Sequence, residues 1–144
     1  MSYEGFSPID FYDQRGNQNT QLGSEAYSAS LKIEHEFDFA TLSSISSYQH
    51  VLENGIQDSD FLDRPDFYNI NTAPINTITQ ELQLASPSGR TFDWTTGLYY
   101  FRSKGKYDPI SFGGQFFPTG VSIYGEQTFE SSVAYAQGTL KLTD

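Results

Sequence analysis

The chain has 144 residues and a formal net charge of −10, from 18 Asp plus Glu against 8 Lys plus Arg, and it contains no Cys. A chain this acidic has no positively charged surface to attract a phosphate backbone, so we expect no nucleic-acid partner. Without Cys it has no disulfide, thiolate metal site or Cys nucleophile, and its 16% aromatic content argues against a disordered protein.

Residues 1–23 show no hydrophobic period and are rich in Asn, Gln, Gly, Ser and Asp, which predicts a surface loop. Residues 1–6 have neither the basic nor the apolar region of a signal peptide, so we expect none in the chain as given. The longest apolar runs, 98–101 and 133–136, have four residues each, whereas a transmembrane helix needs roughly 20.

A first strand is predicted over 24–37, because apolar and polar residues alternate there. Odd positions from residue 27 onward are apolar, with His35 as the exception, and even positions are polar. This period of two is typical of a strand whose two faces meet different surroundings. The apolar members of the series are Tyr27, Ala29, Leu31, Ile33 and Phe37.

A second strand is expected over 41–52, where Ser, Thr and β-branched residues are frequent. Leu42 and Tyr48 share one parity, while Ile45 and Val51 share the other. The pattern therefore leaves open which side of this strand is the apolar one.

Residues 53–76 are rich in Asp, Asn, Gly and Pro and are predicted to form a long loop. A third strand follows over 77–86, with turn residues Ser86-Pro87-Ser88-Gly89-Arg90 at its end. One face of this strand carries Ile78, Leu82 and Leu84, with Gln80 as the exception.

The remaining chain predicts a fourth strand over 92–102, a second long loop over 103–130 and a fifth strand over 131–143. Gly and Pro recur throughout the second loop. The predicted fold is all-β, an antiparallel up-and-down meander in a single domain spanning 1–144.

The connections alternate short and long, which is unusual for a compact soluble domain but typical of an outer-membrane β-barrel. Barrel strands rise about 2.5 Å in depth per residue, so aromatic girdles should lie about ten residues apart. Tyr27 and Phe37 are ten positions apart on one face, and Phe92 and Tyr100 are eight apart. The pattern favours about five strands of a larger transmembrane barrel. The alternative is a secreted β-sandwich that binds carbohydrate through aromatic loop residues.

No catalytic residue is predicted, and the chain is not expected to be an enzyme. Neither His35 nor His50 is accompanied by a nucleophile elbow, and His35 is expected to face an interface or a partner. Glu34 and Glu36 share a face about 7 Å apart by strand rise. We interpret them as lining a polar lumen, with Lys32 as a nearby countercharge.

The acidic run 58–66 superficially resembles a calcium loop, but it lacks the Gly and Glu that an EF-hand has at positions 6 and 12. A solvated loop is the favoured interpretation, with loose divalent binding as the alternative. We predict no defined metal site and no cofactor.

The second long loop is unusually aromatic for a Gly-rich surface segment. Exposed aromatic side chains often supply binding contacts, although the same residues can instead pack the loop against its neighbours. The candidate substrate-binding residues are Tyr107, Phe112, Phe116, Phe117 and Tyr124, with Phe129 nearby.

Several strand sequences resemble barrel segments of TonB-dependent outer-membrane receptors. They are Thr41 to Tyr48 (TLSSISSY), Gln80 to Ser86 (QELQLAS), Asp93 to Phe101 (DWTTGLYYF) and Ala134 to Asp144 (AYAQGTLKLTD). The resemblance covers the five strands, a little under half of the chain, and leaves the loops unmatched.

This resemblance implies a 22-stranded barrel enclosing a plug domain, in the bacterial outer membrane. Such receptors take up ferric siderophores, vitamin B12 or oligosaccharides with energy from TonB. The implied partners are outer-membrane lipid, a small-molecule ligand such as a ferric siderophore, and the TonB complex through the plug. Five strands cannot close a barrel, and the chain shows no plug or TonB box, so we expect it to be a fragment.

Overall fold

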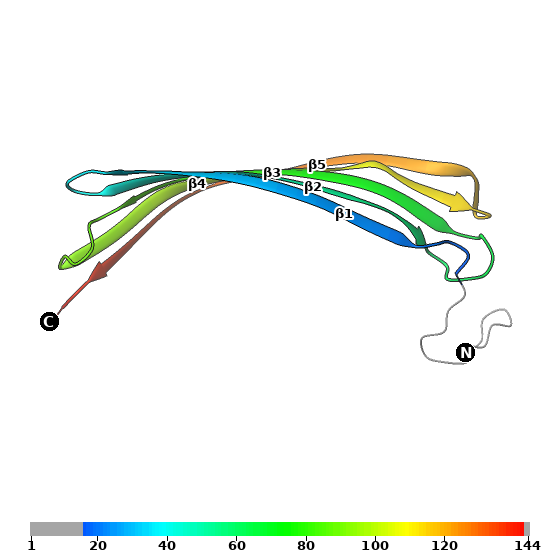
Figure 1. Ribbon diagram of the computed structural model, residues 1–144, viewed down its shortest axis with the longest axis horizontal. Coiled ribbons are helices and arrows are strands. Elements are labelled where there is room, and N and C mark those ends of the chain that lie inside the picture. The colour runs from blue at the N-terminus through cyan, green and yellow to red at the C-terminus, as the bar shows by residue number, and fades with distance from the viewer. Residues whose placement is uncertain (1–15, 143–144) are drawn as a thin grey trace. The chain divides into compact units, whose positions relative to one another are not determined.

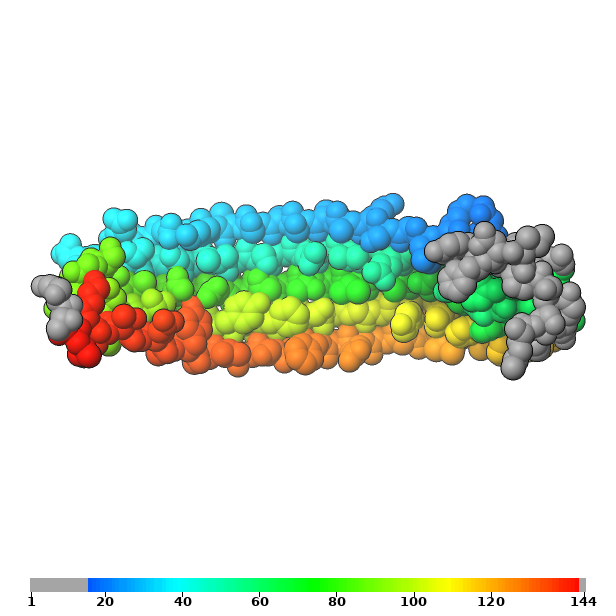
Figure 2. Space-filling model, turned by 90° about the horizontal axis from the view of Figure 1, so that it is seen from below, coloured from blue at the N-terminus to red at the C-terminus, as the bar shows by residue number. Residues whose placement is uncertain are grey.

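The structure is a computed structural model that describes residues 16–142, which form five strands and no helix. Each strand pairs with its neighbours in sequence, in the order β1-β2-β3-β4-β5 (Figures 1 and 2). The predicted all-β antiparallel meander is confirmed for these residues, as one open sheet. The strands are β1 (Gln21–Glu36), β2 (Thr41–Asp58), β3 (Tyr68–Ala85), β4 (Phe92–Gly114) and β5 (Phe117–Leu140).

The prediction of two long loops, 53–76 and 103–130, is wrong over most of their length. The sheet continues through both segments, so that only residues 59–67 connect β2 to β3 and only residues 115–116 connect β4 to β5. The short connections are 37–40 and 86–91. The contrast between short and long connections, which favoured a barrel in the sequence, is thus much weaker in the structure. The predicted loop 1–23 lies partly outside the described residues, and β1 already begins at Gln21.

The extra strand length forms because pairing with a neighbour outweighs the turn preferences of Gly and Pro. Tyr68-Asn69-Ile70-Asn71-Thr72 alternates large and polar side chains, a strand signal that its Asn content obscures. At the end of β4, Gly114 has φ +115°, and a Cβ there would lie 2.4 Å from the Asp66 carbonyl oxygen. Only glycine fits this close approach.

The chain divides into two compact units, each built from three separate stretches. Among the described residues the first unit comprises 16–25, 52–74 and 106–125, and the second comprises 26–51, 75–105 and 126–142. The first unit contains the connections 59–67 and 115–116. The second contains the turns 37–40 and 86–91.

Contacts in the second unit resolve which face of β2 is apolar. The Tyr27 ring stacks on His50 at 4.9 Å between centroids and lies 6.2 Å from Tyr48. Leu42 has the same parity as Tyr48 and therefore lies on the same face as Tyr27 and Leu31. Ile45, of the opposite parity, lies on the polar face.

The same face continues across the rest of the second unit. Ser46 Oγ donates to Gln80 Oε1 at 2.5 Å, which places Gln80, Ile78 and Leu82 on the side of Leu42. We call this side the apolar face. Its large exposed hydrophobic side chains are Tyr27, Leu31, Ile33, Leu42, Tyr48, Ile78, Leu82, Phe92, Leu98, Tyr100 and Leu140.

The opposite side of the second unit, the polar face, is held together by side-chain hydrogen bonds. Ser43 Oγ donates to Glu34 Oε1 at 2.9 Å, and Glu34 also pairs with Lys32 at 2.9 Å. The countercharge expected at Lys32 is therefore present. Farther across the sheet, Ser47 and Thr79 hydroxyls lie 2.6 Å apart.

Very little apolar surface is buried within the sheet. Among residues 16–142, Ala40 and Ala73 are the only buried apolar residues, whereas Leu31, Ile33 and Leu98 are each 59% exposed. A β-sandwich requires a second sheet packed on the first, and the described part of the chain forms one sheet.

Tyr135 fixes β5 against β3 and β4 on the polar face. Its hydroxyl donates to Glu81 Oε1 at 2.6 Å and accepts from Gln83 Nε2 at 3.2 Å. Its ring lies over Gly97, where a Cβ would be 2.5 Å from Tyr135 Oη and 2.8 Å from the Leu82 carbonyl oxygen. Gly97 therefore makes room for the tyrosine.

Replacing Gly97 with alanine should destabilise the sheet by about 1–3 kcal/mol, because neither the Leu82 backbone nor the hydrogen-bonded Tyr135 ring can move freely. Urea unfolding of the full chain, followed by fluorescence of its single tryptophan, Trp94, measures the loss. Gly105→Ala is the matched control, since its Cβ would meet only Ile75 at 3.6 Å. Equal midpoints for the two variants would contradict this account.

Candidate functional site

The five candidate aromatic residues do not form one site. Tyr107 and Phe112 lie on β4, Phe117 and Tyr124 on β5, and Phe116 in the turn between them. Their expected placement in a loop is therefore wrong for all but Phe116, because the β4–β5 hairpin extends through the segment.

Phe112 and Phe117 pack together with a residue that the sequence did not single out. Phe67, at the end of the 59–67 loop, stacks on Phe112 at 5.8 Å and lies 5.7 Å from Phe117, and the last two rings are 6.0 Å apart. For these two residues the structure favours the packing interpretation. All three rings are half-buried.

The other candidates are exposed and lie apart. Tyr107 faces Gly125 across the hairpin, since a Cβ on Gly125 would lie 4.0 Å from Tyr107 Cδ2. Tyr124 is adjacent to Gly125 and so points to the opposite side of the hairpin. In the second unit, Phe129 packs edge-on against Phe101 at 5.9 Å.

A buried carboxylate organises the 59–67 loop. Asp58 is 2% exposed. Its Oδ2 accepts from the Asn17 amide at 2.9 Å and its Oδ1 accepts from the Phe61 amide at 2.9 Å, with longer bonds from the amides of Gln18 and Asp60. This one side chain thus holds the segment before β1 and the loop after β2 in place.

The environment of Asp58 sets its ionisation. Burial raises the pKa of this carboxyl, but the hydrogen bonds from the backbone amides of Phe61, Gln18, Asn17 and Asp60 outweigh burial, so its pKa lies below the ordinary value. The carboxylate is therefore the favoured form, and it serves as a structural anion.

Other carboxylates of the loop are also used structurally. Asp60 Oδ1 accepts from the Leu62 amide at 2.8 Å, and Asp66 is 3% exposed and pairs with Arg64 at 2.7 Å. The prediction of a solvated acidic loop is therefore wrong for Asp58 and Asp66. Asp and Asn side chains often accept hydrogen bonds from nearby backbone amides, so the sequence could have indicated such bonds in this loop. It does not indicate which of the carboxylates is buried.

The loop also holds the tip of the β4–β5 hairpin. The Gln115 amide donates to the Pro65 carbonyl oxygen at 2.9 Å, and the Phe116 amide donates to the Asp66 carbonyl oxygen at 3.1 Å. The connections 59–67 and 115–116 thus form one ordered structure within the first unit. We call their exposed side the tip surface, and its exposed charged and aromatic residues are Phe61, Asp63, Arg64 and Phe116.

The two His residues and the carboxylates of residues 16–142 are the candidates for a metal site. There is no group of three or more His, Asp or Glu residues there that could hold a metal ion. His35 packs edge-on against Phe37 at 4.4 Å, and His50 Nδ1 lies 2.8 Å from Asn76 Oδ1. In the same residues no helix has the length and apolar character needed to cross a membrane.

Aromatic clusters lie at two places in the second unit. Phe37 contacts His35 and stacks on Phe39 at 5.6 Å beside the 37–40 turn. Ten positions before Phe37, Tyr27 contacts Tyr48 and His50. The alternation in the sequence predicts aromatic girdles at these two positions.

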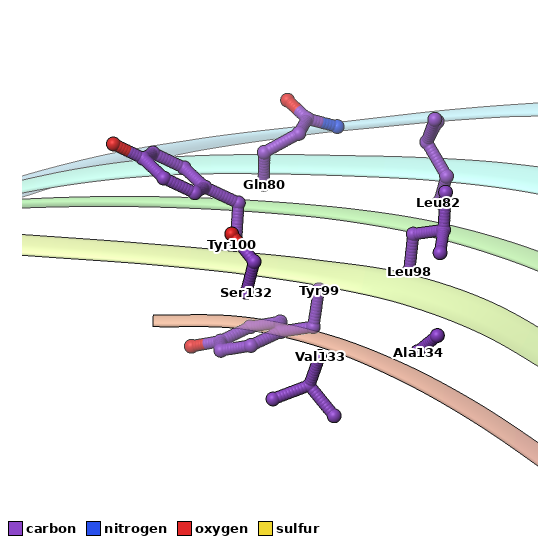
Figure 3. Close-up of a pocket in the computed structure, with 8 residues that line it drawn as sticks. All are labelled: Gln80, Leu82, Leu98, Tyr99, Tyr100, Ser132, Val133 and Ala134. Carbon is purple, nitrogen blue, oxygen red and sulfur yellow. The ribbon is translucent and has the colours of Figure 1, made fainter. Parts of the chain in front are cut away.

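A shallow hollow of about 480 Å³ lies on the second unit and involves β3, β4 and β5. Figure 3 shows Gln80, Leu98 and Tyr100 projecting to one side of the sheet, whereas Val133 projects to the other. The hollow forms where the small side chains of Ser132 and Ala134 lie beside these larger ones. It is part of the apolar face.

No protein-family model, curated protein or solved structure matches this chain.

The low pKa of Asp58 predicts acid-sensitive order in the tip surface. A carboxyl with a depressed folded pKa adds stability above its unfolded pKa, 3.8, and that stability is lost as the pH falls through the lower folded value. Below pH 3.8, amide hydrogen exchange of Asn17 and Phe61, corrected for intrinsic rates, should therefore accelerate.

Asp58→Asn should show fast exchange at both amides already at pH 7, because an Asn side chain offers a single acceptor oxygen. Asp63→Asn is the control, since Asp63 is exposed and accepts none of these bonds. If Asp58→Asn retained wild-type protection at pH 7, the anchoring role would be refuted.

Proposed function

We propose that this chain is part of a TonB-dependent receptor in the bacterial outer membrane, which takes up a siderophore, vitamin or oligosaccharide. In this proposal the apolar face of the second unit contacts lipid and the polar face lines the barrel lumen. The connections 59–67 and 115–116 help to form the extracellular mouth. The observation that carries the proposal is an alternating sheet that exposes most of its large apolar side chains on one face, with Phe129 and Val133 as exposed exceptions on the other.

We expect another layer to cover the exposed apolar side chains of this face, because leaving so many of them in water is unfavourable. Fully burying one Leu or Ile is worth about 1.5–3 kcal/mol. Leu31, Ile33 and Leu98 each keep 59% of their surface exposed. Lipid covers such a face without a second protein layer, as in transmembrane barrels.

The strand segments within the second unit are long enough for a bilayer, although β2, β3, β4 and β5 continue beyond them. The second unit contains 11 residues each of β1 (26–36), β2 (41–51) and β3 (75–85). A tilted transmembrane strand needs about 9–11 residues. β4 and β5 contribute somewhat longer segments, so all five are long enough to cross.

The side chains at the ends of these segments are consistent with the proposed membrane boundary. The aromatic clusters around Tyr27 and Phe37 lie ten positions apart, which corresponds to about 25 Å of depth. Beyond Tyr100 on the same face come Arg102 and Lys104, paired with Glu130 at 3.0 Å and Glu126 at 2.9 Å. Aromatic side chains followed by charged ones are expected where hydrocarbon gives way to water.

Site-directed labelling of the protein expressed from its native gene tests this proposal. These 144 residues contain no Cys, and any Cys elsewhere in the expressed protein is first replaced with Ser. Leu31→Cys and Ser30→Cys, on opposite faces of β1, are labelled with an environment-sensitive fluorophore in isolated outer membranes. Emission should be blue-shifted and quenched by lipid-soluble quenchers at position 31, and not at position 30.

Lys104→Cys is a second control, and its label should report water. Recovery of the protein outside the membrane fraction, or identical emission at positions 30 and 31, would refute the proposal. A soluble, monomeric protein that binds carbohydrate would instead favour the alternative binding module.

A further inference from the structure

The chain contains one asparagine that is followed directly by glycine, Asn54-Gly55 on β2, which we call the Asn-Gly pair. The backbone nitrogen of a residue can attack the side-chain amide carbon of a preceding asparagine. Glycine obstructs that attack least because it has no Cβ. Every other asparagine precedes Gln, Ile or Thr. Asn54 is therefore the position at which this cyclisation is least hindered.

The structure explains why glycine follows Asn54. A Cβ on Gly55 would lie 2.6 Å from the Gln21 carbonyl oxygen and 3.3 Å from Leu22 Cα, both in the backbone of β1. Asn54 is exposed, and its Oδ1 lies over Gly23, where an added Cβ would be 2.9 Å away. The first residues of β1 thus pack directly against the Asn-Gly pair.

The sheet opposes the cyclisation as long as β1 stays in place. Ring closure needs a rotation of the backbone that an extended strand does not permit. Because β1 lies at the edge of the sheet, its first residues can separate from β2 by losing pairing on one side only. The Asn-Gly pair then lies at the sheet edge, where the rotation breaks fewer hydrogen bonds.

Asp58 holds the chain just before β1 next to the end of β2. Its Oδ2 accepts a hydrogen bond from the Asn17 amide at 2.9 Å. Its own amide donates to Thr20 Oγ1 at 3.2 Å. Because residues 17–20 lead directly into β1, these bonds also keep the first residues of β1 on the Asn-Gly pair.

We propose that Asn54 is a site of spontaneous deamidation and that the hydrogen bonds of Asp58 limit its rate. The Gly55 nitrogen bonds to Asn54 Cγ, and the side-chain nitrogen leaves as ammonia, taking up the amide proton through solvent. A water molecule then opens the succinimide ring at either of its carbonyl groups. The product is an aspartate or an isoaspartate, with a carboxylate in place of the side-chain amide.

The products alter the start of the sheet. Both add a negative charge next to Glu53. In isoaspartate the main chain also runs through the former side-chain methylene, and this added backbone atom disturbs the register of β2 against its neighbours. Isoaspartate at position 54 should therefore release the first residues of β1. The inference is independent of the proposed function, since it depends only on contacts within the first unit.

The experiment incubates the native protein, in the form in which fractionation recovers it, at mildly alkaline pH. Peptide mass spectrometry follows conversion at each asparagine, and an isoaspartate methyltransferase labels the isoaspartate. In urea, Asn54 should convert about tenfold faster or more than Asn19, which is also exposed but precedes the β-branched Thr20. In the folded protein, Asn54 should convert more slowly than in urea.

Matched variants test the control by Asp58. Asp58→Ala should speed the conversion of Asn54 in the folded protein about fivefold or more, because residues 17–20 are released. Alanine is chosen because an asparagine at position 58 would add a second site of deamidation. Asp38→Ala also removes an exposed carboxylate, in the turn that joins the opposite ends of β1 and β2, and should leave the rate unchanged.

A milder variant separates release of β1 from unfolding of the whole chain. Thr20→Val removes only the hydroxyl that accepts from the Asp58 amide. It should give a rate of Asn54 conversion between those of the wild type and Asp58→Ala, with unchanged Trp94 fluorescence. Asn54→Gln should abolish the methyltransferase label at position 54.

Conversion of Asn54 in urea no faster than that of Asn19 would overturn the assignment of the site. Equal rates for Asn54 in the folded wild type and in urea would overturn the protection by the sheet. If Asp58→Ala and Thr20→Val both retained the wild-type rate, Asp58 would not limit the reaction.

Discussion

Hydrogen bonding between neighbouring backbones is the interaction on which the rest of this sheet depends. In most domains, burial of apolar side chains between layers supplies much of the stability. Here the described residues bury only Ala40 and Ala73 among their apolar side chains, so one layer holds its strands through pairing and cross-strand contacts. The pleat then places alternate residues on opposite faces. Ser47 bonding to Thr79 on one face and Tyr27 stacking on His50 on the other follow directly from that geometry.

Alternation also explains which parts of the fold the sequence predicts well. The series from Tyr27 to Phe37 identifies β1 and its faces because every position except His35 obeys one period. In β2, Leu42 and Ile45 have opposite parities, so the sequence does not show which face is apolar. The contacts of β2 with β1 and β3 show it. The segment 68–76 contains Asn and Pro and reads as loop, yet it is strand, since pairing with β4 satisfies its backbone groups. Local preference and tertiary pairing conflict there, and pairing prevails.

The candidate site is less predictable for a related reason. Composition identifies the aromatic excess of residues 107–129 but not which rings meet, because that depends on hairpin register. Phe67 is distant in sequence from Phe112 and Phe117 and completes their cluster. In the sequence, Asp58 is one of several carboxylates in a predicted loop. In the structure it is buried, and it accepts a hydrogen bond from the Asn17 amide, which is distant in sequence. Long-range hydrogen bonds of this kind leave no short-range pattern.

Strand number constrains how a barrel could include this sheet. In an antiparallel meander of five strands, β1 and β5 run in the same direction, so direct joining of these edges makes a parallel pair. Bacterial single-chain barrels are antiparallel, with an even number of strands and at least about eight. A barrel containing this meander would therefore require an odd number of further strands. The strand beside β5 would meet the small side chains of Ala134, Ala136 and Gly138 on the apolar face. Large side chains on that added strand would fill the space beside Ala134 and Ala136, whereas the Phe92 ring already lies over Gly138.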